Sequence, residues 1–181
     1  MFMNRLIALS TILLFLGSAS LANDNDLKTI SYRGGLVTFR IPSYWVEEYE
    51  PDGGGTFYEN GPDTGTLRLS VITLKTPPTK MGNLATNALA GMSDVDPSKI
   101  RLLKSKLALA QYIKHSSENG QNITLYWWHL ASAGEAGVVR VANYSYTILT
   151  KQENDKNILQ ELSVVQQEIE NASIYSGLHG N

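Results

Sequence analysis

Cysteine is absent from all 181 residues of the chain. Its absence excludes disulfide bonds, thiol nucleophiles, cysteine-ligated zinc and a lipid-modified N-terminal cysteine. The chain also has no large excess of either charge, because 15 basic and 17 acidic residues leave a formal net charge of −2. Such a chain lacks the basic excess of an electrostatic nucleic-acid binder, so we expect no nucleic-acid partner.

The first residues have the composition of a secretory signal peptide. Arg5 precedes an apolar run of eleven residues, Leu6–Leu16, and small residues stand three and one positions before a cleavage after Ala22. The run is shorter than the roughly 20 residues that span a bilayer, so we expect no stable membrane insertion after cleavage. An uncleaved anchor is the alternative. An exported chain without cysteine fits a bacterial periplasm better than a eukaryotic secretory route.

The rest of the chain has the length and hydrophobic content, 43% overall, of one globular domain. We expect residues 1–22 to be the signal peptide, 23–29 a flexible N-terminus, 30–175 the single domain and 176–181 a disordered tail.

Two strand-like runs form the centre of this domain. Ile123–Ala131 and Val138–Leu149 are rich in β-branched and aromatic residues, and the glycine-bearing segment Ser132–Gly137 joins them. The first run is almost free of charge, which is typical of a strand covered on both faces. The pattern therefore predicts a hairpin in the middle of a sheet. The adjacent Trp127 and Trp128 must point to opposite faces of that sheet.

Strand and helix patterns alternate along the remaining sequence. Leu36–Ile41 alternates in polarity up to Pro42, and we expect Trp45 to close the end of the sheet. The other predicted strands are Ile30–Tyr32, Val46–Glu50, Thr56–Glu59 and Thr66–Leu74. Two further strands, or one bent strand, are predicted over Ile100–Leu107 and Leu109–Ser117. Helical spacing predicts one helix over Thr79–Met92 and another from Gln152 to about Tyr175. The order predicts an α+β fold, a mainly antiparallel sheet packed by helices as an α/β/α sandwich.

The last predicted helix carries an apolar stripe along one side. Its six residues are Ile158, Leu159, Leu162, Val165, Ile169 and Ala172. We expect this stripe to lie on the sheet. A basic stripe formed by Lys99, Arg101, Lys104 and Lys106 is expected to protect an edge strand.

The sequence resembles the PsbP-like superfamily over about residues 30 to 175. The matching features are the Val37–Trp45 segment, glycine turns before Leu67–Val71, the predicted helix Thr79–Met92, an Asn-Gly turn before Tyr126-Trp127-Trp128, and the terminal amphipathic helix. The resemblance implies an α/β/α sandwich that mostly binds other macromolecules. Its bacterial periplasmic branch includes immunity proteins that neutralise type VI secretion effectors, and the superfamily shares no catalytic set to transfer.

The sequence gives little support for a catalytic function. A His-based triad would need a serine and a carboxylate beside His115, His129 or His179, and no Gly-x-Ser-x-Gly nucleophile turn is present. We interpret His129 as a packed or hydrogen-bonded strand residue. The expectation is therefore a protein that is not an enzyme, with a hydrolase as the alternative.

Acidic and aromatic residues concentrate in the first third of the chain and form our predicted partner-binding site. Its members are Tyr49, Glu50, Asp52, Phe57, Tyr58, Glu59 and Asp63. Aromatic anchors with a charged rim are the usual composition of a protein-binding patch. A paired-carboxylate glycosidase and a calcium site are alternatives, although the EF-hand spacing is missing. We expect no cofactor, with Ca²⁺ as the one candidate.

These features lead to one functional hypothesis. We expect a non-enzymatic periplasmic binding protein, an immunity protein that occludes a secreted effector. An envelope accessory factor that assists a membrane complex is the alternative.

Overall fold

The computed structural model describes residues 26–75, 83–175 and 177. The predicted signal peptide, residues 23–25, the start of the predicted helix Thr79–Met92 and all of the predicted tail except Gly177 lie outside the described residues. So does His179.

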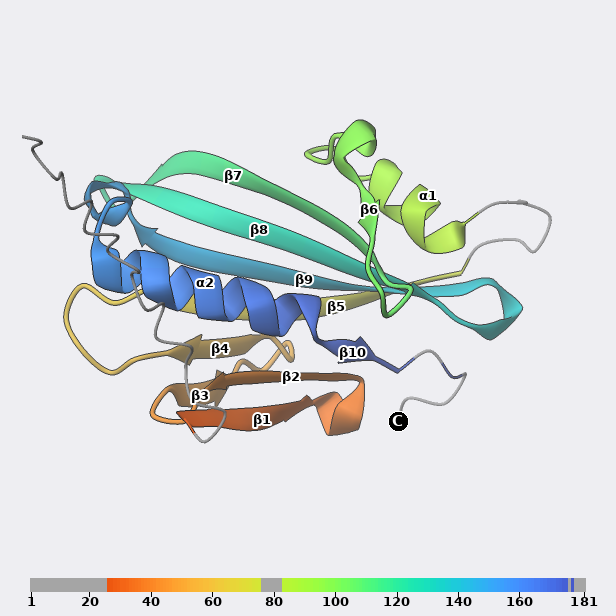
Figure 1. Cartoon of the computed structure of the whole chain (residues 1–181), viewed down its shortest axis with the longest axis horizontal. Coiled ribbons are helices and arrows are strands. Elements are labelled where there is room, and N and C mark those ends of the chain that lie inside the picture. The colour runs from red at the N-terminus through yellow and green to blue at the C-terminus, as the bar shows by residue number, and fades with distance from the viewer. Residues whose placement is uncertain (1–25, 76–82, 176, 178–181) are drawn as a thin grey trace, which may run out of the picture.

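Seven antiparallel strands form the main sheet, in the order β3-β4-β5-β9-β8-β7-β6 (Figure 1). Their bounds are β3 Val46–Tyr49, β4 Gly55–Tyr58, β5 Thr66–Lys75, β6 Arg101–Leu102, β7 Ala108–Glu118, β8 Gln121–Ala133 and β9 Val138–Leu149. The predicted hairpin is confirmed as β8 and β9, which lie in the interior of this sheet. The turn between them is a 3₁₀ turn at Glu135–Gly137.

A second, three-stranded sheet has the order β1-β2-β10, from β1 Leu27–Tyr32, β2 Val37–Pro42 and β10 Ser173–Ile174. The alternation predicted for β2 is confirmed, because Val37, Phe39 and Ile41 are all buried. The flexible N-terminus predicted for residues 23–29 is wrong from Leu27 onward, since Leu27 pairs with Pro42 in an antiparallel ladder. The local sequence pattern did not indicate that these strands form a sheet separate from the main one.

The two helices are both shorter than predicted. Helix α2 spans Lys156–Glu170, because the Asp155 side chain accepts hydrogen bonds from the first backbone amides and the chain leaves the helix at Asn171 to form β10. Helix α1 spans Leu84–Ala90 and begins with an Asn83 cap.

Helix α2 and the small sheet cover one face of the main sheet. Their shared core joins Ile158, Val165 and Ile169 of α2 to residues of β2 and of the main sheet, among them Phe39 and Tyr144. Leu159 departs from the predicted stripe, because its side chain is 46% exposed. Helix α1 packs on the opposite face, so the predicted α/β/α sandwich is confirmed.

Three turn and edge predictions have clear outcomes. The Asn-Gly turn between β7 and β8 is confirmed, with positive φ of 51° at Asn119 and 78° at Gly120, as a two-residue hairpin turn requires. Strand β6 ends the sheet as predicted, but it is only two residues long. Trp45 is 2% exposed and stacks over Tyr146 with ring centroids 6.4 Å apart.

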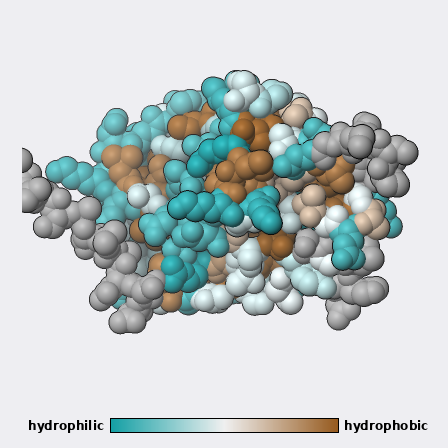
Figure 2. Space-filling model, turned by 45° about the vertical axis from the view of Figure 1, so that its right-hand side comes forward, coloured by the Kyte–Doolittle hydropathy of each residue, from teal (hydrophilic) through white to brown (hydrophobic). Residues whose placement is uncertain are grey.

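Apolar surface is scattered. On the side shown in Figure 2, hydrophobic residues appear as several separate patches between hydrophilic ones. Among residues 26–75 and 83–175, no helix has both the length and the apolar character that crossing a bilayer requires.

Candidate binding face

Among the described residues, a helix covers only one end of the main-sheet face that lies opposite α2. Helix α1 packs there on small residues that allow close approach, including Ala108, Ala110 and Ala131. No other helix in the described part of the chain packs on this face. We call the part beyond α1 the open face. Its residues are Val46, Glu48, Thr56, Tyr58, Thr66, Arg68, Ser70, Tyr112, Lys114, Ile123, Leu125, Trp127, His129, Asn143, Ser145 and Thr147.

Cross-strand register brings distant residues into one row across the open face. The row follows the printed pairings from β3 to β7: Glu48, Thr56, Arg68, Ser145, Trp127 and Tyr112. Side chains directly opposite one another in such a ladder are in contact distance. The row therefore places an exposed carboxylate, an exposed guanidinium and two aromatic rings on a single line.

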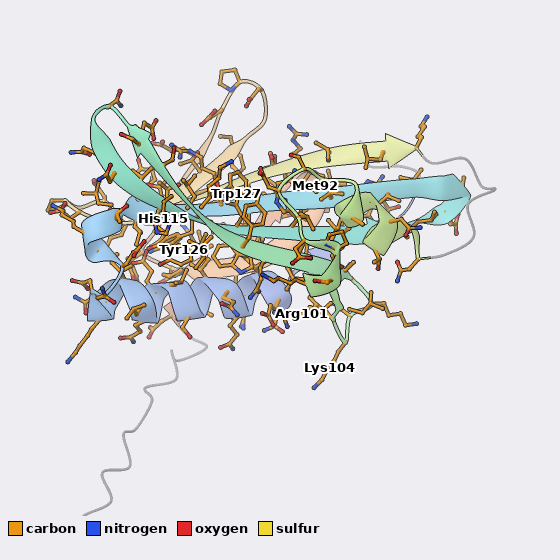
Figure 3. All side chains as sticks on the ribbon, turned by 90° about the horizontal axis from the view of Figure 1, so that it is seen from above. Met92, Arg101, Lys104, His115, Tyr126 and Trp127 are labelled. Carbon is orange, nitrogen blue, oxygen red and sulfur yellow. The ribbon has the colours of Figure 1, made fainter. Side chains whose placement is uncertain are left out.

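Three aromatic rings form the centre of this face. Trp127 stacks on His129 with centroids 5.6 Å apart, and Tyr112 lies 6.3 Å from Trp127 and 5.5 Å from His129. Trp127 is half-buried, and its Nε1 has no hydrogen-bond partner among the described residues. The two tryptophans point to opposite faces as predicted, and only Trp128 is fully buried. In Figure 3 the neighbouring Tyr126 lies toward α2 and Trp127 lies away from it.

His129 is fixed by two hydrogen bonds. Its Nδ1 lies 2.7 Å from Asn143 Oδ1, and its Nε2 lies 3.2 Å from the Tyr112 hydroxyl. Burial lowers the pKa of His129 below its usual value, more than the bond to Asn143 raises it. The prediction of a packed, hydrogen-bonded strand residue is confirmed. Its partners are an amide and a phenol, not the serine and carboxylate of a triad.

We expect acid to destabilise the fold through His129. A base whose folded pKa is depressed contributes stability above its unfolded pKa of about 6.5, and that stability is lost as pH falls below it. Urea unfolding at pH 7.5 and at pH 5 should show a larger loss of unfolding free energy for the natural chain than for His129→Gln. Equal losses in the two proteins would contradict this assignment.

In the structure, the acidic residues of the predicted partner-binding site lie in two separate groups. Tyr49, Glu50 and Asp52 lie together at the β3–β4 turn, where Asp52 accepts a hydrogen bond from the Gly54 amide at 2.9 Å. Glu59 and Asp63 lie at the other end of β4, in the loop to β5, and Asp63 pairs with Lys151 at 3.6 Å.

Three aromatic members of the predicted site are strand residues and not loop residues. Phe57 is fully buried in the core, so its assignment as a contact residue is wrong. Tyr49 is 50% exposed, and Tyr58 is half-buried on the open face, where its hydroxyl donates to Glu48 at 2.9 Å. That hydrogen bond is the main reason that the pKa of Tyr58 is raised. The hairpin of β3 and β4 therefore adds an acidic margin to the open face.

No cluster of three or more histidine, aspartate or glutamate side chains within the described residues has the arrangement of a metal site. The acidic residues near the N-terminal strands are distributed over both faces of β3, since Glu47 and Glu48 alternate.

This chain is similar to several solved structures in its fold. A protein from Bacteroides thetaiotaomicron matches 83% of this chain at 18% identity with a TM-score of 0.57, and this chain spans only 49% of that protein. LpqN, involved in cell envelope biogenesis of Mycobacterium tuberculosis, matches over 76% of this chain and 82% of its own, at 15% identity and a TM-score of 0.53. The Saccharomyces cerevisiae Ran-binding protein Mog1p matches 82% of this chain and 95% of its own, at 10% identity and a TM-score of 0.46.

A scan against protein-family models and a search of curated proteins both find no match. At identities below 20%, the matches to the Bacteroides protein and to LpqN indicate a shared α+β fold and nothing about activity.

Proposed function

We propose that this chain is a non-enzymatic binding protein of the bacterial envelope that engages a protein partner through the open face. The observation that carries the proposal is the unequal coverage of the main sheet. One face is covered by α2 and the small sheet, whereas the other carries α1 at one end and exposed polar and half-buried aromatic side chains elsewhere.

The composition of the open face supports a protein partner. Half-buried aromatic residues surrounded by polar and charged groups are typical of protein interfaces, and tryptophan and tyrosine supply much of the binding energy in such patches. Trp127 and Tyr112 are half-buried at the centre, and Arg68 and Glu48 are exposed toward the β3 side.

The acidic margin indicates the charge of the partner. Glu48, Glu50 and Asp52 are exposed along the β3–β4 hairpin beside the open face. Complementary charge accelerates association and excludes wrong partners, so a partner with a basic rim fits this margin. An effector whose basic cleft is blocked by this surface is the finer form of the proposal, in which the chain is a periplasmic immunity protein.

An envelope accessory factor is the second candidate. The observation that favours it is the shared fold with LpqN, a protein involved in cell envelope biogenesis. A growth or envelope defect after deletion in a strain that lacks any matching effector would favour this candidate over an immunity protein.

Binding measurements on purified protein test the proposal. The chain without residues 1–22 is purified together with the product of the neighbouring open reading frame, and the affinity of the complex is measured by calorimetry. We expect Trp127→Ala to weaken binding about thirtyfold, as removal of a central aromatic anchor does. We also expect the charge reversal of Glu50 and Asp52 to lysine to slow association at low salt.

Two further variants separate binding from folding. Ser70→Arg places a large side chain on the exposed part of the open face and should weaken binding without lowering the melting temperature. Gln160→Arg makes the same change in charge on the outer surface of α2 and should leave binding unchanged. A complex that tolerates Trp127→Ala and Ser70→Arg, or a chain for which periplasmic cross-linking finds no protein partner, would refute the proposal.

A further inference from the structure

Within the described part of the chain, most of the outer edge of strand β7 is unpaired. Strand β6 pairs with it only through Arg101 with Leu109 and Leu102 with Ala108. No strand among residues 26–75 and 83–175 pairs with the outer side of β7 from Gln111 to Glu118, as Figure 1 shows along the upper margin of the sheet. The backbone groups on this side are therefore available to another strand.

An exposed apolar strip lies beside this edge, on the side of α2. His115 of β7 bonds to Glu153 just before α2 begins, and Arg101 links Gln111 to Glu170 at the end of α2. Ile113 therefore lies beside the middle of the helix, and its side chain is 58% exposed.

The side of α2 that carries Glu170 also carries Leu159, Ser163 and Gln166, at helical spacing. A shallow groove of about 440 Å³ runs along these residues. Leu159 in this groove is 46% exposed, so the edge of β7 and the flank of α2 form one surface with apolar residues that remain uncovered.

The charges of β7 are self-complementary when two copies of the strand run in opposite directions. Lys114, Ser116 and Glu118 lie on the same face of the strand, with the positive charge two residues before the serine and the negative charge two residues after it. When two copies of β7 pair antiparallel about Ser116, Lys114 of each copy lies opposite Glu118 of the other. Opposite charges in such cross-strand pairs stabilise a ladder, and like charges destabilise it.

We propose that the β7 edge is a homodimer interface in which a second copy of this chain pairs antiparallel about Ser116. A two-fold axis perpendicular to the sheet joins the two main sheets into one. The same axis places both α2 helices on one side and sets Ile113 of each copy opposite Asn119 in the hairpin turn of the other. Both open faces then lie on the opposite side, so the dimer presents two partner-binding surfaces in the same direction.

Analytical ultracentrifugation of the chain without residues 1–22 tests the proposal, at concentrations of about 1 to 100 μM. We expect a reversible dimer that Ile113→Asp weakens, because Ile113 is exposed at the end of the paired stretch, opposite Asn119 of the other copy. The matched control is Ile72→Asp, because Ile72 is also exposed, at 42%, but lies on β5 away from this edge. This control should leave the dimer intact. Circular dichroism and melting temperature establish that both variants fold.

A charge exchange tests the register. Lys114→Glu should weaken the dimer about tenfold, and adding Glu118→Lys should restore most of the loss, because the exchanged pair is again opposite in sign. Lys114 also pairs with Asp94 of its own chain at 3.6 Å, so Asp94→Ser is the control and should leave the dimer unchanged.

A natural chain that stays monomeric over the whole concentration range overturns the proposal, as does a dimer whose affinity Ile113→Asp leaves unchanged. A double variant that is weaker than Lys114→Glu alone overturns the register about Ser116. These outcomes do not test the open face and its protein partner, because the dimer is measured without that partner and Ile113 lies on the α2 side of β7. Lys114 is the one tested residue that also belongs to the open face.

Discussion

Gly65→Ala is expected to cost about 3 kcal/mol of unfolding free energy, as strong overpacking in a core does. Gly65 is buried immediately before β5, and a Cβ atom there would come closer than 3.0 Å to the ring and hydroxyl of Tyr146. That ring has little freedom to move, because it stacks on Trp45 and its hydroxyl donates a hydrogen bond to Glu161. Urea unfolding followed by tryptophan fluorescence measures the loss.

The same loop provides the control for this prediction. Gly61→Ala would place its Cβ atom 3.5 Å from a methyl group of Thr64, an ordinary contact, so we expect a change within about 0.5 kcal/mol. If the clash with Tyr146 causes the loss, Gly65→Ala should cost much less in a Tyr146→Leu background. An equal cost in both backgrounds would show that backbone conformation, and not the ring, requires glycine.

Glu168→Ala is expected to cost about 2–3 kcal/mol, because it removes a buried carboxylate that binds the Arg40 guanidinium at the junction of α2 and β2. The carboxylate accepts two hydrogen bonds from Arg40, at 2.8 and 3.0 Å, and only 4% of the Glu168 side chain is exposed. The Arg40 side chain is 37% exposed, so water partly compensates its charge and the loss stays below that of a fully buried pair.

Glu170→Ala is the matched control on the same helix. Glu170 also pairs with an arginine, Arg101, at 2.5 Å, but the two side chains are 27% and 46% exposed. An ion pair so accessible to water contributes little, and we expect a loss of about 0.5 kcal/mol. Chemical unfolding of both variants at low and at high salt measures the difference. Equal losses would show that burial does not set the strength of these pairs.

Only part of the candidate binding face could be predicted from the sequence. The acidic β3–β4 hairpin and the opposed directions of Trp127 and Trp128 follow from local composition and the period of two along a strand. Phe57 was misassigned because an aromatic residue between glycine turns has the same local pattern whether it faces solvent or the core. Tyr112, Asn143 and His129 were not grouped, because a hydrogen-bonded set drawn from three strands needs a known register.

The sequence by itself determined most strands, both helices and the hairpin at the centre of the sheet, because these depend on periodicity, proline, glycine and side-chain branching over neighbouring residues. Its signal-peptide pattern and its lack of cysteine also set the expectation of an exported protein. Tertiary structure decided that β1, β2 and β10 form a separate sheet beside α2. It also decided which face of the main sheet stays open and where the β7 edge is unpaired. Those features depend on contacts between residues far apart in the chain, and the local pattern of polar and apolar residues does not encode which strands become neighbours.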